Sequence, residues 1–207
     1  MKKEVLLWIF LLITLDIIQY YLNNTLITEE ILASELSNYL DNETATKLAE
    51  QSQSNNRILL KNLTHLLLTG AKVFGTITLL YIGLLLANLK LSWYNLLEGV
   101  LKLYPIFFIT EFVKFFYFQF FQQDYTYFEL NAFRLFSITQ ISNLAGLAMQ
   151  GKTAAFFNTF GILDVTFCWL LSQELNKESD KPVTATVFIT FFTGLALWKS
   201  LLLLIAP

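Results

Sequence analysis

The residues best able to do chemistry are ionisable side chains that lie within apolar stretches. They form a candidate charge network of Asp16, Lys72, Glu111, Lys114, Arg134 and Asp164. An ionisable group at the centre of a membrane helix costs roughly 2.5 to 3.5 kcal/mol, so each needs a partner or a route to water. Glu111 and Lys114 are three residues apart and can neutralise each other on one helical face. Lys72, Lys102 and Lys199 can instead extend toward the membrane surface.

Asp164 raises the sharpest question, because its short side chain lies near the middle of an apolar stretch, in GILDVTF. Arg134 or Lys72 from another helix could pair with it, which would fix helix packing. A second interpretation is a proton or ion relay of Asp164, Glu111 and Arg134, as in secondary transporters. A third is that Asp16 or Asp164 faces another subunit and pairs there. All three interpretations remain open from the sequence.

Patterns typical of catalytic, metal-binding and nucleic-acid-binding proteins are missing from the sequence. The single histidine, His65, cannot make H-E-x-x-H, and neither G-x-S-x-G nor a phosphate-binding G-x-x-x-x-G-K-[ST] occurs. Cys168 is the only cysteine, so the sequence offers no His/Cys cluster. The net charge of -2 comes without a basic stripe, which argues against nucleic acid as a partner. We therefore expect no enzyme, no catalytic residue, no cofactor and no metal site.

The composition indicates that a lipid bilayer surrounds much of the chain. Of the 207 residues, 55% are hydrophobic, 16% are aromatic and only 14% are charged, whereas about 25% are charged in soluble domains. Apolar runs near the length of about 20 residues that crosses hydrocarbon predict six spans. They cover residues 5–22, 66–89, 99–121, 130–149, 153–171 and 183–205. If the fourth were only re-entrant, the number would be five. The predicted fold class is an all-α, polytopic transmembrane helix bundle with a short extracytoplasmic helical segment.

Three segments follow from this pattern: an N-terminal anchor at 1–22, an acidic segment at 23–64 and a five-span domain at 65–207. Lys2 and Lys3 precede the first span, and Tyr20 and Tyr21 stand where a cleavable signal would have small residues, which favours an uncleaved anchor. Glycines in the second span, including Gly83, permit close helix approach and predict a place inside the bundle. Residues 122–129 and 176–182 are predicted loops.

The acidic segment is the clearly water-facing part of the chain. Apolar residues from 27 to 40 recur at helical spacing, a break is expected near Asn42, and residues 51–56 form a polar hinge. Four carboxylates, Glu29, Glu30, Glu35 and Asp41, are candidates for docking a partner. The alternative is that the segment forms two solvated helices that cover the mouth of the bundle.

Lysines predict the orientation of the spans. Six spans place both termini on one side, together with Lys90 and Lys152, while the acidic segment, Asp124 and Glu129 share the other side. An excess of lysine is typical of cytoplasmic loops, so both termini are expected in the cytoplasm. The compact chain without a eukaryotic sorting tail favours a bacterial cytoplasmic membrane.

One family resemblance lies in three stretches, WYNLLEGVLKLYPIFFI at 93–109, LNAFRLF at 130–136 and LAGLAMQGKTAAF at 144–156. This pattern resembles Yip-type (Rab-GTPase-interacting) multi-pass membrane domains over residues 65–207, with Tyr104-Pro105, Phe133, Gly146 and Lys152 at matching places. The tryptophan usual after the phenylalanine is replaced by Phe136 or is absent. The resemblance implies a helical membrane domain that acts through protein partners and membrane organisation.

The sequence predicts a non-catalytic membrane subunit or scaffold of a larger complex. Its expected partners are the lipid bilayer and other membrane subunits or a second copy of the chain. The alternative is a small secondary transporter or channel-like protein that uses the Asp164, Glu111 and Arg134 relay. A conducting path needs polar stripes on several helices, and only the fourth predicted span shows one. The sequence therefore favours assembly over transport.

Overall fold

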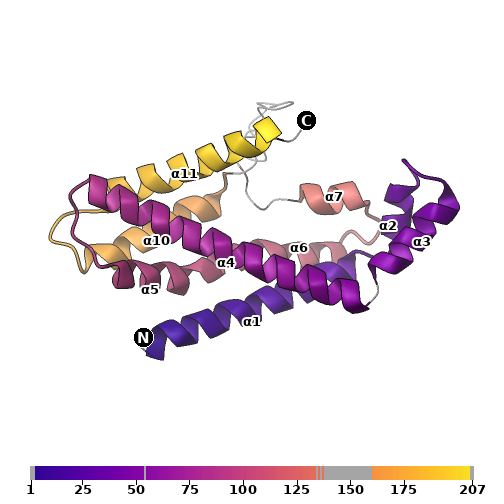
Figure 1. Ribbon diagram of the computed structural model, residues 1–207, viewed down its shortest axis with the longest axis horizontal. Coiled ribbons are helices and arrows are strands. Elements are labelled where there is room, and N and C mark those ends of the chain that lie inside the picture. Colours follow the sequence, from indigo (N-terminus) through magenta and orange to yellow (C-terminus); the bar gives the residue numbers. More distant parts are fainter. Residues whose placement is uncertain (1–2, 54, 134, 136, 138–159, 206–207) are drawn as a thin grey trace. The chain divides into compact units, whose positions relative to one another are not determined.

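The structure is a computed structural model that describes residues 3–53, 55–133, 135, 137 and 160–205. Every regular element in these ranges is a helix, apart from an isolated antiparallel bridge between Ser137 and Gly161. The predicted all-α class is confirmed for them. In chain order (Figure 1), the elements are α1 (Lys3–Leu26), α2 (Glu29–Leu36), α3 (Asn42–Ser52), α4 (Asn55–Leu86), α5 (Trp93–Leu103), the 3₁₀ helix η1 (Tyr104–Phe107), α6 (Phe108–Phe120), α7 (Tyr127–Ala132), α10 (Ile162–Asn176) and α11 (Thr184–Ile205).

The chain folds into two compact units. Unit 1 contains residues 1–12, 71–107 and 134–207, and unit 2 contains residues 13–70 and 108–133. The chain passes from one unit to the other within α1, within α4, between η1 and α6, and after residue 133. The division therefore cuts across the three predicted sequence segments, because α1 and α4 each contribute to both units.

Two of the described helices are long and apolar enough to cross a bilayer. They cover Lys3–Leu26 and Arg57–Leu86, and Thr184–Leu197 is a shorter apolar helix. These helices overlap the first, second and last predicted spans, although α4 begins at Asn55, within the predicted acidic segment. The predicted third span lies in α5 and α6 and is interrupted by η1, which contains Pro105. Proline lacks a backbone N–H and clashes with the preceding turn, so it breaks a regular helix.

The expected boundaries of the fourth and fifth spans are wrong. α7 begins inside the predicted loop 122–129, and it ends at Ala132 because Phe133 has an extended backbone. A long helix therefore does not start at Leu130, and most of the fourth predicted span lies outside the described residues. α10 begins only at Ile162, nine residues after the predicted start. It then continues past residue 171 to Asn176.

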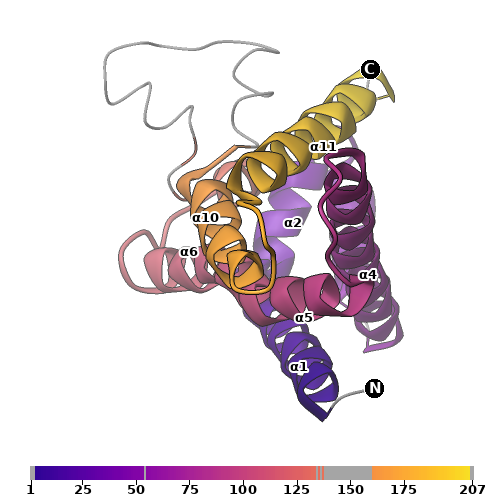
Figure 2. The ribbon, with the colours of Figure 1, turned by 90° about the vertical axis from the view of Figure 1, so that its left-hand side faces the viewer.

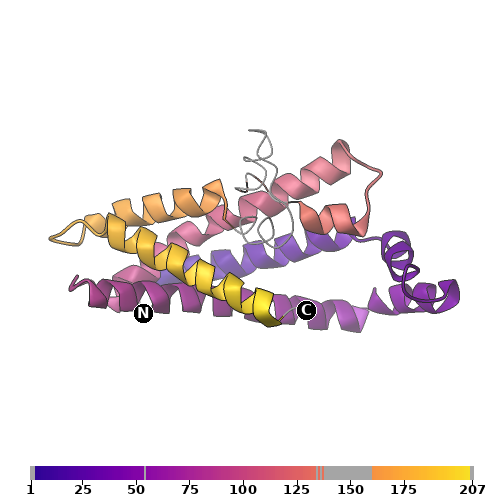
Figure 3. The ribbon, with the colours of Figure 1, turned by 90° about the horizontal axis from the view of Figure 1, so that it is seen from above.

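Unit 1 is held together by α10, which contacts both α5 and α11 (Figure 2). Phe167 of α10 is fully buried, and its ring centroid lies 5.0 Å from that of Phe107 and 5.3 Å from that of Phe191. α10 and α11 leave the same turn (Figure 3), where the Asn176 carboxamide accepts a hydrogen bond from the Val183 backbone N–H at 2.8 Å. The predicted turn at 176–182 is confirmed.

Gly83 of α4 is the glycine whose close packing is clearest. A Cβ atom added there would collide with the Thr190 side chain of α11, with Thr190 Cβ at 2.8 Å. By contrast, Gly70 and Gly75 have open space around the position of a Cβ. The expectation that small residues permit close approach is therefore met at Gly83 and not at the other two.

Replacing Gly83 by alanine tests this contact. We expect Gly83→Ala to lower the free energy of unfolding by about 1–3 kcal/mol, because an extra methyl group would overpack the interface. The control is Gly75→Ala on the same helix, which should leave stability unchanged or raise it slightly, since alanine favours a helix more than glycine. Thermal unfolding of the purified protein measures both, and equal stability of the two variants would contradict the interpretation.

In unit 2, α2 and α3 pack against each other as a helical hairpin, and α2 also contacts α7. The core beneath is an apolar cluster of Leu26, Phe118 and Leu130. The Tyr125 hydroxyl donates to the Leu26 carbonyl at 2.7 Å, and burial raises the pKa of this phenol. The predicted break near Asn42 is confirmed, since α3 starts there.

Side-chain caps fix the ends of the short helices in unit 2. Thr28 accepts a hydrogen bond from the Ile31 N–H and starts α2, and Asp41 accepts one from the Thr44 N–H at 2.9 Å and starts α3. At α7, Thr126 and Glu129 form a reciprocal capping box. These bonds satisfy backbone donors that the first turn of a helix leaves without partners.

The Asp41 cap predicts a pH dependence. Hydrogen bonds from Thr44 hold the pKa of this exposed carboxyl below its usual value. The cap therefore stabilises α3 fully above the unfolded-state pKa of about 3.9, and this contribution is lost as the pH falls through the lower folded-state pKa. We expect Asp41→Ala to accelerate amide hydrogen exchange in α3 near neutral pH. Asp41→Asn should keep the cap without the pH dependence. Equal exchange in wild type and Asp41→Ala would contradict the cap.

Candidate functional site

The most deeply buried charged side chain described is Asp16, in the part of α1 that belongs to unit 2. Asp16 is fully buried, and its Oδ2 lies 3.2 Å from Nδ1 of His65 on α4. The imidazole is half-buried, with 35% of its side chain exposed. A neutral imidazole can donate its Nδ1–H to the carboxylate, and a protonated one would form an ion pair with it. Asp16 is thus paired within this chain, which departs from the interpretation that it faces another subunit.

Sequence reasoning missed this pair, because it considered His65 only as a member of catalytic and metal-binding motifs. A usable signal was present: Asp16, Tyr20, Asn23 and Ile27 follow one another at the spacing of one helical face. The Tyr20 hydroxyl donates to the backbone carbonyl of Ile58 on α4 at 2.9 Å. The polar members of this face, Asp16, Tyr20 and Asn23, form a polar stripe on α1, and Asp16 and Tyr20 contact α4.

The predicted ion pair of Glu111 and Lys114 on α6 is confirmed. Lys114 Nζ lies 3.6 Å from Glu111 Oε2, and Lys114 is buried while Glu111 is half-buried. Asn23 of α1 donates its amide N–H to the same Glu111 oxygen at 3.0 Å. Because a carboxylate only accepts hydrogen bonds, this contact fixes the orientation of the amide. Through this hydrogen bond, the ion pair on α6 also contacts α1.

Two buried oxygens next to these contacts have no hydrogen-bond donor among the described residues, Asp16 Oδ1 and Asn23 Oδ1. Buried polar atoms are nearly always satisfied, so each exception requires a physical reason. Both atoms are acceptors, and both belong to the polar stripe of α1. This part of unit 2 therefore has unused capacity to accept hydrogen bonds.

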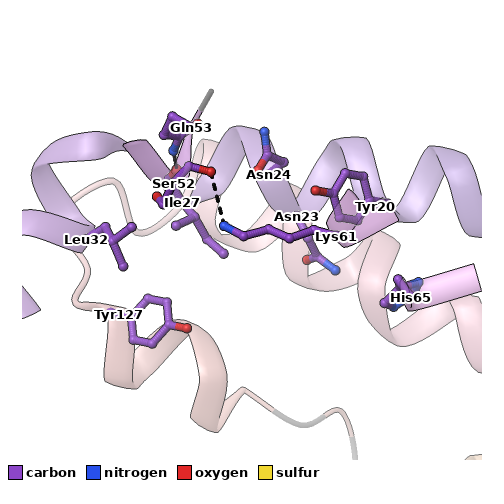
Figure 4. Close-up of a pocket in the computed structure, with 10 residues that line it drawn as sticks. All are labelled: Tyr20, Asn23, Asn24, Ile27, Leu32, Ser52, Gln53, Lys61, His65 and Tyr127. Carbon is purple, nitrogen blue, oxygen red and sulfur yellow. Dashed lines mark hydrogen bonds between the residues drawn. The ribbon is translucent and has the colours of Figure 1, made fainter. Parts of the chain in front are cut away.

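Beside the stripe lies a pocket of about 230 Å³ (Figure 4), within unit 2. Its walls come from α1, α2, α4 and α7 and from the end of α3. They are formed by Tyr20, Asn23, Asn24, Ile27, Leu32, Ser52, Gln53, Lys61, His65 and Tyr127. Lys61 extends across the pocket and donates to the Ser52 carbonyl at 3.2 Å. Gln53 donates to the Ile27 carbonyl at 2.6 Å and closes the hairpin end.

Asp164 does not occupy the position that the sequence suggested. It lies in the first turn of α10, where its Oδ2 accepts a hydrogen bond from the Gly161 N–H at 2.8 Å. The expectation of a mid-helix carboxylate is wrong because α10 starts at Ile162, so the side chain caps a helix end. Arg134 lies outside the described residues. Lys72 is exposed on α4, and within the described ranges it makes no ion pair with Asp164.

A second group of charges in unit 1 joins two lysines to Glu174. Lys102 extends to Glu174 at 2.6 Å, and Lys177 meets the same carboxylate at 2.6 Å. The two lysines lower the pKa of Glu174. Both pairs are largely exposed, so their contribution to stability is small.

The four candidate docking carboxylates are all in the hairpin. Glu29 and Glu30 occupy the first turn of α2, where the helix dipole favours negative charge. Asp41 caps α3, and these three side chains are exposed, while Glu35 is half-buried. They therefore have local structural roles that do not prevent contact with a partner.

Comparison with protein-family models, curated proteins and solved structures gives no match to this chain. The resemblance of residues 65–207 to Yip-type domains therefore stays a prediction. What the polar site can do follows from its own geometry.

The Asp16 and His65 pair predicts a strong coupling in stability. His65→Phe should lower the free energy of unfolding by about 3–5 kcal/mol, because it leaves a buried carboxylate without a partner. Replacing both partners, as Asp16→Leu with His65→Phe, should recover most of the loss. Denaturant unfolding of the detergent-purified protein measures this cycle, with Asp124→Asn, an exposed loop carboxylate, as the control. Additive effects of the two substitutions would rule out the pair.

Proposed function

We propose that this chain is a six-span integral protein of a bacterial cytoplasmic membrane, with both termini in the cytoplasm. In this proposal it serves as a non-catalytic subunit or scaffold of a larger membrane complex. It binds its partners through helix–helix contacts and through the α2–α3 hairpin, which lies outside the cytoplasm. The resemblance to Yip-type domains supports a role in assembly.

The observation that carries this proposal is the surface of the hairpin. α2 has no buried residue, and the turn between α2 and α3 exposes Tyr39 by 79% next to Leu40 and Asp41. Exposed aromatic residues are enriched at protein interfaces, where a rigid ring fills a pocket of the partner. The carboxylates of Glu29 and Glu30 favour a basic partner surface.

Apolar side chains on the long helices offer a second kind of contact. Phe10 on α1 is exposed by 71%, and Leu67 and Leu86 on α4 are also largely exposed. Water would disfavour such surfaces, so they are assigned to lipid or to neighbouring membrane helices.

A hairpin variant tests the subunit proposal. The native host would express the tagged full chain, and material purified in mild detergent would be sized and analysed by mass spectrometry. We expect a stoichiometric partner, and we expect Tyr39→Ala with Glu29→Gln and Glu30→Gln to reduce its recovery at least about tenfold, the effect of losing about 1.4 kcal/mol. The control is Asp180→Asn in the α10–α11 turn, which should retain the partner.

Two results would contradict the proposal. One is recovery of the chain without any other protein, and the other is an unchanged partner yield from the hairpin variant. Correct membrane insertion of the variant, measured in parallel, separates lost binding from lost folding.

A second candidate function is a small secondary transporter or channel-like protein. The sequence assigned this role to Asp164, Glu111 and Arg134, and the capping bond of Asp164 gives that carboxylate a local structural task. The observation that favours transport is instead that α1 makes two polar contacts within unit 2, Asp16 with His65 of α4 and Asn23 with Glu111 of α6. Reconstituted flux that is lost in Glu111→Gln would support this candidate.

A further inference from the structure

The walls of the unit 2 pocket carry a lysine and no carboxylate. Among the wall residues that the structure describes, Lys61 is the only one with a permanent charge, and none is an aspartate or a glutamate. Asp16 and Glu111 are not wall residues, and each already has a partner, His65 for Asp16 and Lys114 for Glu111. The pocket therefore presents a cation to a molecule that enters it.

The ammonium group of Lys61 has further capacity to bind. It carries three N–H donors, and the bond to the Ser52 carbonyl at 3.2 Å uses one of them. The side chain is exposed and extends across the pocket (Figure 4). The carboxamides of Asn24 and Gln53 also line the pocket, and such groups both donate and accept hydrogen bonds. These walls suit an anion that carries hydroxyl groups.

Lys61 lies near one end of a candidate membrane span. The apolar stretch of α4 begins at Arg57, so Lys61 is about 6 Å along the helix axis from that end, at a rise of 1.5 Å per residue. A lysine near a helix end extends its ammonium to the membrane surface. Tyr20 and Tyr127 line the same pocket, and tyrosine is enriched at the level of lipid headgroups. Both features favour a lipid headgroup as the occupant.

Exposed leucines continue along α4 from Lys61 toward the other end of the span. Leu68 follows Lys61 by seven residues, or about two turns, so it lies on the same helix face, and it is exposed by 56%. Leu60 and Leu67 form a neighbouring exposed row. Acyl chains would cover such apolar side chains. A lipid with its phosphate at Lys61 would therefore place its chains against this surface.

We propose that this pocket binds the headgroup of an anionic phospholipid of the phosphatidylglycerol class. The lipid phosphate pairs with Lys61 through a charge-assisted hydrogen bond. The hydroxyl groups of the headgroup contact the neutral polar walls, and the acyl chains lie along the exposed leucines of α4. This inference rests on the membrane location in the proposed function.

The charge and size of the headgroup favour this class over zwitterionic lipids. Phosphatidylethanolamine and phosphatidylcholine carry a cationic nitrogen beside the phosphate, and the described walls offer it a lysine and no carboxylate. The volume of about 230 Å³ is far above the 10–15 Å³ or so that one water requires. It is below the roughly 300–1,000 Å³ of sites for drug-sized ligands. A short polar headgroup fits this range, with the acyl chains outside the pocket.

Thermal unfolding of the full chain tests the proposal, in phosphatidylcholine nanodiscs that contain increasing fractions of phosphatidylglycerol. We expect a saturable rise in Tm on the order of 2–4 °C. Phosphatidylserine has the same net charge but carries an ammonium group. Glycerol phosphate, added in solution, has the phosphate and the hydroxyl groups without acyl chains. Neither of these two should reproduce the rise.

Variants at Lys61 locate the site, because this exposed side chain should be replaceable without loss of folding. Lys61→Gln should raise the half-saturating fraction of phosphatidylglycerol about fivefold, the effect of one lysine near an anionic membrane surface. Lys61→Arg should retain the response within about twofold. Lys47→Gln is the matched control, because Lys47 is exposed on α3, pairs with Glu43 and does not line the pocket. The Tm of each variant in pure phosphatidylcholine reports its folding separately.

Four results overturn the proposal: no shift with phosphatidylglycerol, an equal shift with phosphatidylserine, an equal shift with glycerol phosphate, or an unchanged response in Lys61→Gln. An equal shift with glycerol phosphate would identify a free anion as the occupant. Alkaline extraction of membranes separates this inference from the proposed function. A chain that stays in the membrane and does not respond to phosphatidylglycerol contradicts the lipid site alone, whereas a chain released from the membrane contradicts both.

Discussion

A carboxylate inside an apolar helix needs a donor, and the pairing of Asp16 with His65 determines how α1 meets α4 in unit 2. Three contacts follow the same register: residue 16 meets 65, residue 20 meets 58, and residue 27 meets 53. Residue numbers rise along one partner as they fall along the other, which is the pattern of an antiparallel arrangement. The polar groups thus specify the alignment, whereas apolar helix faces alone permit several registers.

The pocket and the hairpin both depend on this alignment. Gln53 and Lys61 can close the pocket only because the chain returns past Ile27 in the same register. The side-chain caps of Thr28 and Asp41 then determine where α2 and α3 begin. The two helices of the hairpin therefore have defined starting residues. The surface proposed to dock a partner and the pocket lined by residues of α1 and α4 are consequently neighbours in one compact unit.

Helix type was predictable from the sequence, and helix ends were less so. Long apolar runs predicted α1, α4 and α11. In an apolar environment, a helix is the structure in which one segment forms all its backbone hydrogen bonds within itself. The caps at Ser92 and Thr126 start helices earlier than hydropathy suggests, since their hydroxyl groups accept backbone hydrogen bonds. Hydropathy averages over many residues and is insensitive to such single contacts. α7 ends where Phe133 has an extended backbone, and α10 begins after Gly161, whose N–H donates to Asp164.

In the candidate site, contacts within one helix were predictable from the sequence, and contacts between helices were not. Glu111 and Lys114 could be paired from the sequence, because their spacing within one helix is sufficient. Asp16 and His65 are 49 residues apart, and no periodicity relates two helices to each other. The sequence predicted Asp164 near the middle of a helix, whereas α10 begins at Ile162. A helix that begins inside an apolar run does not change the local composition, so hydropathy does not reveal its first residue.

The long sequence separation within the Asp16 and His65 pair also has a consequence for biosynthesis. A ribosome adding about 5–20 residues per second needs about 2.5 to 10 seconds to make the 49 residues from Asp16 to His65. During that interval α1 carries a carboxylate whose donor has not yet been made. The contact that aligns α1 with α4 can therefore form only after α4 has been synthesised.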